Sequence, residues 1–245
     1  TGLSPSTAYQ FRQRVKDSAG NVTTGTAVSK MTNATPPWGA VYADDFTAPD
    51  GTALVGRAVP TAPSPTTYQT VLDSAPTLSG GRLIPGALSS VSLGWGVFKF
   101  SGAMIDVKAS NKVEYTVSWK SGDTHPEGVA LIYGATGPKH FQALIIAGTS
   151  NQRWYTVKGG EQGGEVNLAT PFSGGPSYGG NHTMTATITR TGTSATLDVV
   201  VNGVKKLNGY ALPELTYTGT LMGIGASSGG STTTATIDSW SVTAV

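Results

Sequence analysis

Hydrophobic and polar residues alternate with a period of two through most of the chain, in short runs separated by turn residues. In the run 111–120, Val113, Tyr115, Val117 and Trp119 share one face of the expected strand, and polar residues occupy the other face. No long run shows the 3.6-residue period of an amphipathic helix. The pattern therefore predicts an all-β protein with many short strands.

Two runs in the middle of the chain, 127–135 and 140–148, are apolar at almost every position. Strands that are buried on both faces have this continuous pattern, so we expect these two in the centre of a covered sheet. Farther on, Asn202-Gly203 predicts a two-residue hairpin turn, because both positions of a type I′ turn need a positive φ. About a dozen such strands in 39–245 favour two antiparallel sheets packed face to face.

The first residues form a separate pattern. Two runs of alternating polar and apolar residues flank the turn cluster Asp17–Asn21, which predicts one β-hairpin. A hairpin alone is marginally stable in water, so this one needs partners. The Pro-rich stretch 33–38 predicts an extended linker to a second domain at 39–245.

The residues of this hairpin resemble a known family. Gly2-Leu3, Pro5, Thr7, Tyr9 and Phe11, followed by Asp17, Ala19, Gly20 and Asn21, are similar to the last two strands of a fibronectin type III domain. The resemblance implies that Tyr9 forms the tyrosine corner of such a sandwich. Because that domain needs about 100 residues, we expect 1–32 to be its C-terminal part, within a longer polypeptide.

Charge and composition exclude several classes of function. Residues 1–32 carry four basic residues against one acidic residue, a net charge of +3, and the remaining residues carry twelve against thirteen, a net charge of −1. The main domain thus has no basic excess for nucleic acid. The chain has no cysteine, which excludes disulfides and thiolate sites. No apolar run reaches the length of about 18 residues that a membrane helix needs, so membrane insertion is not expected.

The second domain also resembles a family. Its opening has Asp45-Phe46, Asp50-Gly51-Thr52, Leu54 and Gly56-Arg57; Gly81 and Leu83 follow, and Ile237-Asp238 lies near the end. These residues are similar to those of the concanavalin A-like jelly roll of laminin-G type. The resemblance implies an antiparallel two-sheet jelly-roll sandwich over 39–245. The sequence departs from the family at Tyr68, where Trp is more usual.

The two resemblances together are similar to the arrangement in minor tail proteins of phages that infect actinobacteria. This implies a structural protein of the virion tail, whose jelly roll binds a host-surface glycan or neighbouring tail subunits, as a homo-oligomer. Secreted actinobacterial glycosidases use similar modules. A carbohydrate-binding module of a secreted, extracellular enzyme is therefore the alternative, and a glycoside hydrolase is a third.

Candidate catalytic residues are scarce. Glycosidases need two carboxylates at a set separation across the sugar, and the best-known family of this fold carries them as Glu-x-Asp-x-x-Glu on one strand. None of the five Glu residues lies in that pattern, and Glu114 faces away from the apolar side of its strand. We therefore expect no enzymatic activity.

Sugar binding has broader support, because sugars stack on aromatic faces and bond to amides and charges. On the middle strands, which build the concave sheet in this fold, the candidates are Tyr133, His140, Gln142, Arg153 and Tyr155. Neighbours on a strand point to opposite faces, so Trp154 opposes Arg153 and Tyr155. We expect Trp154 in the core and the other two exposed, because Trp carries the larger apolar area.

Three aspartates offer a metal hypothesis. Asp44 and Asp45 lie on the first strand of the second domain and Asp238 on the last, and such strands often lie side by side in jelly rolls. Calcium takes several carboxylate oxygens, so a structural Ca²⁺ is one reading. The alternative, which we favour, is that Asp45 and Asp238 accept backbone hydrogen bonds and that Asp50 forms a turn. No other cofactor is expected.

Overall fold

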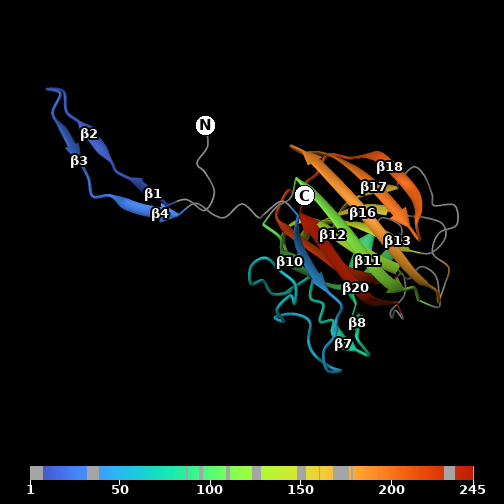
Figure 1. The fold of residues 1–245 in the computed structure, drawn as a ribbon. Helices are drawn as coiled ribbons and strands as arrows, with labels where there is room; N and C mark the ends of the chain where they lie inside the picture. Colours follow the sequence, from blue (N-terminus) through green and yellow to red (C-terminus); the bar gives the residue numbers. More distant parts are fainter. Residues whose placement is uncertain are drawn as a thin grey trace. The chain divides into compact units, whose positions relative to one another are not determined.

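A computed structural model describes residues 8–31, 39–86, 88–93, 96–108, 111–122, 128–147, 153–159, 161–167, 177, 179–228 and 235–244. The chain divides into two compact units, Thr1–Pro37 and Trp38–Val245 (Figure 1). Within the described ranges every regular element is a β-strand. No helix there is long and apolar enough to cross a membrane. The linker predicted at 33–38 lies outside these ranges.

The first unit is a β-hairpin, as predicted. Strand β1 (Ala8–Phe11) pairs with β4 (Val28–Met31), and β2 (Arg14–Lys16) pairs with β3 (Val22–Thr24). At the turn, the Asp17 carboxylate accepts backbone hydrogen bonds from Ala19 (3.0 Å) and Asn21 (2.8 Å). Gly20 has a φ of 92°, which a side chain would disfavour. The side chain of Tyr9, the predicted tyrosine corner, is not among the described ones.

The second unit consists of two antiparallel sheets. We call the first the covered sheet; in spatial order it contains β15 (Glu161–Asn167), β14 (Arg153–Lys158), β13 (His140–Ala147), β12 (Gly128–Gly137), β19 (Leu221–Ser228), β10 (Gly96–Asp106) and β6 (Gln69–Thr70), with β9 (Ser89–Leu93) also paired to β10. We call the second the solvent-facing sheet; it contains β18 (Val204–Leu212), β17 (Ser194–Val201), β16 (Asn181–Thr191), β11 (Lys112–Lys120), β20 (Thr236–Ala244), β8 (Arg82–Ile84) and β7 (Thr77–Ser79), with β5 (Ala40–Asp44) also paired to β20.

The chain passes repeatedly from one sheet to the other. It leaves β10 of the covered sheet for β11 of the solvent-facing sheet and returns at β12; later it crosses from β15 to β16, from β18 to β19 and from β19 to β20. All described strand pairs are antiparallel. This is the predicted two-sheet antiparallel jelly-roll sandwich.

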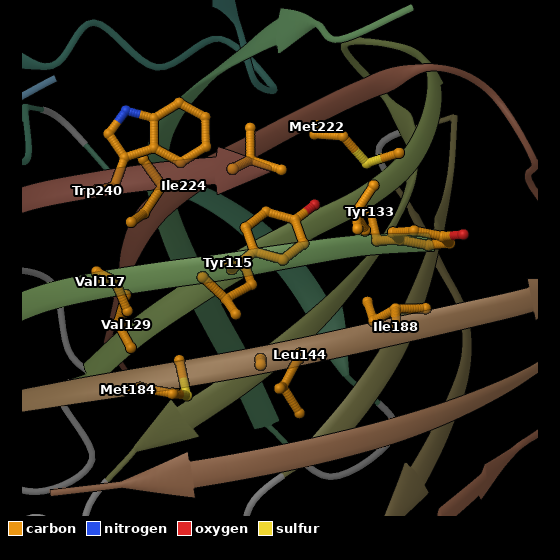
Figure 2. Packing of buried hydrophobic residues seen from close by; sticks show 14 of the residues in the cluster. Tyr115, Val117, Val129, Tyr133, Leu144, Met184, Ile188, Met222, Ile224 and Trp240 are labelled. Carbon is orange, nitrogen blue, oxygen red and sulfur yellow. The ribbon is translucent and has the colours of Figure 1, made fainter. Parts of the chain in front are cut away.

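The main core lies between the two sheets. Figure 2 shows Val117 and Met184 of the solvent-facing sheet packed with Val129, Leu144 and Ile224 of the covered sheet. The strand 112–120 alternates as predicted, with Val113, Tyr115, Val117 and Trp119 all buried. The Tyr115 hydroxyl donates to the Ile132 carbonyl across the core (2.6 Å), so the buried phenol is satisfied.

A second apolar cluster lies on the outer face of the covered sheet. Because side chains alternate along a strand, residues that flank the core positions of β12, β13 and β14 point to this side. Among the described residues, Val71 and Leu72 of the segment after β6 also belong to it. The prediction of strands buried on both faces is therefore confirmed for the described side chains of 128–135 and 141–146. The cluster comprises Val71, Leu72, Phe100, Met104, Ala130, Ile132, Ala135, Phe141, Ala143, Ile145, Tyr155 and Val157.

The hairpin turn between β17 and β18 has the predicted geometry. Asn202 has a φ of 50° and Gly203 a φ of 76°, both in the left-handed region that a type I′ turn requires. Elsewhere the Gly-rich run in β19 has a packing role: a Cβ on Gly223 would lie 2.5 Å from the Ala103 carbonyl oxygen of β10. This contact explains a glycine in the middle of a central strand.

Candidate functional site

The outer face of the solvent-facing sheet is rich in short hydroxyl side chains. On β11 and β16 every second residue points into the core and the residues between them point to solvent, and β20 alternates in the same way on either side of a bulge at Asp238. Strand register brings the outward residues into rows across the sheet. We call this surface the hydroxyl face; it consists of Thr116, Ser118, Thr183, Thr185, Thr187, Thr189, Ser239, Ser241 and Thr243.

One row of the hydroxyl face ends in a groove. Thr116 lies opposite Ser241, Ser241 lies opposite Ala43 of β5, and Ala43 pairs with Thr61 through backbone hydrogen bonds of 2.9 and 3.2 Å. Neighbouring strands lie about 4.8 Å apart, so the row is continuous. Ala43 is the smallest side chain in it and leaves space above the sheet. The resulting groove has a volume of about 350 Å³ and is lined by Ala43, Asp44, Asp45, Pro60, Thr61, Thr116, Ser239, Trp240 and Ser241.

Asp45 supplies the exposed charge of the groove. It follows directly after β5, and its carboxylate accepts a hydrogen bond from the Thr47 backbone N–H (3.1 Å). That hydrogen bond, helped by the Thr47 side chain and the Arg57 charge, lowers the pKa of Asp45 below its usual value. Asp45 is therefore an ionised acceptor at neutral pH, and it accepts a backbone hydrogen bond, which is the role that we favoured over calcium ligation.

Asp44 lies beneath the groove in a buried polar network. Its carboxylate forms an ion pair with Arg57 and accepts hydrogen bonds from the Tyr68 hydroxyl (2.9 Å) and the Phe46 backbone N–H (2.7 Å). The Tyr68 hydroxyl in turn accepts from the Trp240 indole N–H (2.8 Å). Burial and the adjacent Asp44 charge raise the pKa of Tyr68, which keeps it a neutral donor. The network fixes the wall of the groove from below.

The network also explains the residue motif at the start of this unit. Phe46 is fully buried at a φ of 59°, an uncommon conformation that the Asp44 hydrogen bond to its N–H supports. Asp50 accepts a hydrogen bond from the Gly80 N–H (2.7 Å), which links the turn at 50–51 to the turn at 80–81. At Tyr68, where the sequence departs from the laminin-G pattern, the hydroxyl joins Asp44 to Trp240. The motif therefore holds the scaffold around the groove.

The three aspartates of the metal hypothesis have separate partners. Asp44 is paired with Arg57, Asp45 caps its own turn, and Asp238 forms an ion pair with Arg82 (2.8 Å). In the part of the chain that the structure describes, no group of three His, Asp or Glu side chains is placed to hold a metal ion. Asp238 is thus ion-paired with a side chain, where we had expected a hydrogen bond from a backbone donor.

Three of the predicted sugar-binding residues lie around the loop that precedes β19. The Gln142 amide donates to the Tyr217 carbonyl (2.9 Å) and accepts from the Thr216 N–H (3.0 Å), so both of its ends are occupied. His140 is exposed, and its ring meets the Tyr217 ring edge-on at 5.8 Å. Tyr133 is fully buried against Trp154, and burial raises its pKa to about 12. Only His140 of these three is open to solvent.

The predicted exposure of β14 is wrong in part. Trp154 lies in the main core as expected, but Tyr155 is only 1% exposed, because it belongs to the apolar cluster on the outer face of the covered sheet. A residue that points away from one core enters a second core here. The side chain of Arg153 is outside the described ones. Tyr133 and Tyr155 are both buried, so neither ring is accessible for stacking against a sugar.

A polar cluster that the sequence did not suggest surrounds His182. Its Nε2 lies 3.0 Å from the Ser177 carbonyl and 3.3 Å from the Ser121 hydroxyl, and its Nδ1 lies 3.1 Å from the Asn202 side-chain nitrogen. Asn202 keeps its amide nitrogen toward His182 because its oxygen accepts from the Thr183 N–H. The ring is then the neutral tautomer with the proton on Nε2. That nitrogen cannot take a proton from Ser121, so the arrangement ties turns together and does not activate a nucleophile.

No protein-family model matches the chain, and no curated protein matches it in sequence. Among solved structures, it is similar to a mutant of the alginate lyase Aly36B in complex with alginate trisaccharide, with a TM-score of 0.49 and 15% identity over 84% of this chain and 99% of that chain. Peanut lectin has a TM-score of 0.44 and 12% identity over 84% and 97% of the two chains. The exoplasmic/lumenal domain of VIP36, in its Ca²⁺/Man2-bound form, has a TM-score of 0.43 and 12% identity over 84% and 88%. These likenesses concern the fold alone.

Proposed function

We propose that the sandwich unit is a non-enzymatic glycan-binding module of a virion tail protein, and that the groove beside β5 is its binding site. The observation that carries the proposal is the groove itself. It lies on a sheet face, next to hydroxyl groups in strand register, with the ionised Asp45 at its edge.

The chemistry of the lining suits a polyhydroxylated ligand. Hydroxyl groups of Thr61, Thr116 and Ser241 can each donate and accept, as can the hydroxyls of a sugar. Asp45 adds a charged acceptor, whose hydrogen bonds are stronger than those between neutral groups. Strands and the Asp44 network hold these groups in place, which reduces the entropy lost on binding.

The charges in the lining favour binding over hydrolysis. Glycoside hydrolysis uses one carboxylate as acid and a second as base or nucleophile. Two carboxylates line the groove, but Asp44 is buried and neutralised by Arg57, which leaves Asp45 as the one exposed carboxylate of the lining. Glu114 lies on the same sheet face, partly exposed, and its carboxylate meets the Thr187 hydroxyl at 3.4 Å.

The virion context rests on the resemblance of the two-module sequence to phage minor tail proteins. In that setting the ligand is a host-surface glycan, neighbouring tail subunits are further partners, and the chain forms a homo-oligomer. A module of a secreted enzyme would use the same groove, and the two settings differ in the ligand. Binding to actinobacterial envelope glycans supports the tail role, and binding to plant polysaccharide supports the secreted module.

A glycan array with the full chain tests the proposal. Bound glycans are then titrated against Asp45→Asn and Thr116→Ala, with Thr196→Ala as the matched control on the exposed face of β17. Asn keeps an acceptor oxygen but removes the charge, and a hydrogen bond to a charged group is worth about 1–1.5 kcal/mol more than a neutral one, so Asp45→Asn should weaken binding by roughly tenfold. Because the pKa of Asp45 is lowered, wild-type binding should persist in mild acid and fall only when the pH drops through that lowered value.

Equal binding by all three variants and the wild type would move the site away from the groove. Retained folding of each variant is checked by near-ultraviolet circular dichroism. Turnover of a bound glycan that disappears in Glu114→Gln would replace the binding role by a hydrolytic one.

A further inference from the structure

The chain contains two Asn-Gly pairs a few residues apart, and the structure places them in contrasting surroundings. Asn202-Gly203 forms the turn between β17 and β18, and Asn208-Gly209 lies within β18. Asn-Gly sequences are the most prone to spontaneous cyclisation, because glycine leaves its backbone nitrogen open to attack on the preceding amide. Which of the two pairs reacts depends on the contacts of each.

The amide of Asn202 is held at both ends. Its oxygen accepts a hydrogen bond from the Thr183 N–H (2.9 Å), and its nitrogen donates to His182 Nδ1 (3.1 Å). Its backbone N–H also donates to the Thr183 carbonyl (2.9 Å). Cyclisation would break these side-chain hydrogen bonds and distort a turn in which both residues have positive φ.

Asn208-Gly209 lies in a bulge. Leu197 pairs with Tyr210 and Val199 pairs with Leu207, so Asn208 and Gly209 together oppose the single residue Asp198. Both residues are exposed, and Gly209 has a φ of 62°. A bulge releases residues from the regular ladder and re-aims their groups, which removes the restraint that a flat strand would impose.

Two charged groups in the bulge touch the atoms that would react. The Gly209 backbone N–H donates to the Asp198 carboxylate (3.0 Å), and the Lys205 ammonium contacts the Asn208 side-chain oxygen. Lys205 Nζ also lies 3.7 Å from Asp198 Oδ1, so the two charges share one site. The Asp198 carboxylate, a base, thus contacts the backbone N–H of Gly209, whose nitrogen would attack. The Lys205 ammonium contacts the oxygen of the Asn208 side-chain amide, which would be attacked.

We propose that Asn208-Gly209 is a built-in site of spontaneous succinimide formation and deamidation. The Gly209 backbone nitrogen bonds to Asn208 Cγ while its proton passes to Asp198. The Lys205 ammonium stabilises the negative charge that develops on the Asn208 side-chain oxygen. The Cγ–Nδ2 bond then breaks, the departing nitrogen takes up the proton, and ammonia leaves. Water opens the ring at either carbonyl, which yields isoaspartate or aspartate.

The reaction would change the charge of the solvent-facing sheet. Asp198 lies opposite Thr187 of the hydroxyl face, and each conversion of Asn208 adds a negative charge beside it. The inference does not depend on the glycan proposal, because it concerns the chemistry of the chain alone.

Tryptic mapping of the folded full chain tests it. Cleavage after Arg190, Lys205 and Lys206 places Asn202 in 191–205 and Asn208 in 207–245, and each peptide holds no other asparagine. The protein is incubated at mildly alkaline pH in heavy-oxygen water, so that newly formed aspartate and isoaspartate carry the label. We expect label at Asn208 at least about tenfold faster than at Asn202, as general base catalysis would give.

Variants separate the contributions of the two charged groups. Asp198→Ala should slow labelling at Asn208 by about tenfold, and Lys205→Gln should slow it several-fold, while Asn202 is unaffected. In concentrated urea both Asn-Gly pairs should label at the same rate, because the difference comes from the fold. Equal rates in the folded chain, faster labelling of Asn202, or unchanged labelling in both variants would overturn the proposal.

Discussion

The two sheets of the sandwich share one core but differ on their outer faces. Ile132, Ala143 and Tyr155 on the outer face of the covered sheet are buried, whereas Thr116, Thr185 and Ser241 on the outer face of the other sheet are partly or fully exposed. A strand whose two faces both lie in apolar clusters is apolar at nearly every position. A strand with one face in solvent keeps the polar–apolar alternation. The difference shows that ligand access is to be sought on the alternating strands of this chain.

The groove follows the same distinction. It lies on the solvent-facing sheet, at the row in which Ala43 has the smallest side chain. Most aromatic candidates for sugar contact lie on the covered sheet, where burial makes them packing residues. The threonines and serines of the hydroxyl face, which point away from the core, are the residues that a ligand can reach.

The largest expected effect tests whether both faces of the covered sheet are core. Trp154→Ala and Tyr155→Ala should each lower the free energy of unfolding by about 3–5 kcal/mol, because each removes a buried aromatic ring from one of the two clusters. Thr187→Ala, on the hydroxyl face, should stay within about 0.5 kcal/mol of the wild type. Denaturant unfolding measures all three. A stable Tyr155→Ala protein would mean that the outer cluster is not a second core.

An intermediate effect is expected at the base of the groove. Asp44→Asn should cost about 2–4 kcal/mol of unfolding free energy, somewhat less than a fully buried pair, because the Arg57 side chain is 16% exposed. The matched control is Asp238→Asn, whose pair with Arg82 is partly exposed and should contribute about 1 kcal/mol or less. If the two variants unfold alike, the buried network does not hold the groove.

The smallest expected effect concerns metal removal. EDTA should leave the melting temperature unchanged, because Asp44 and Asp238 are each neutralised by an arginine and Asp45 caps its turn. Thermal unfolding is followed with EDTA and then with added calcium. A lower melting temperature in EDTA that calcium restores would show that these carboxylates gather around an ion.

Much of the fold followed from local pattern. Alternation in 112–120 and continuous apolar residues in 128–135 depend on which faces of a strand are buried, and burial is a property that composition along the strand records. The Asn202-Gly203 turn and the Asp17–Asn21 turn depend on φ preferences of single residues. Such features need no knowledge of distant contacts.

Tertiary structure alone decided what the outward residues meet. Period-two alternation states that Tyr155 opposes Trp154, but whether that side is solvent or a second cluster depends on segments far away in the sequence, such as Val71–Leu72. Likewise, the sequence shows that residue 44 is an aspartate, but it does not show what the carboxylate contacts. The folded chain brings Arg57 and Tyr68 to it, which makes Asp44 a buried structural group.

The sequence by itself determined strands, turns and the two-sheet class, because these arise from local geometry and burial. The groove, the Asp44 network and the bulge at Asn208 depend on strand register between distant segments, which local preferences do not encode.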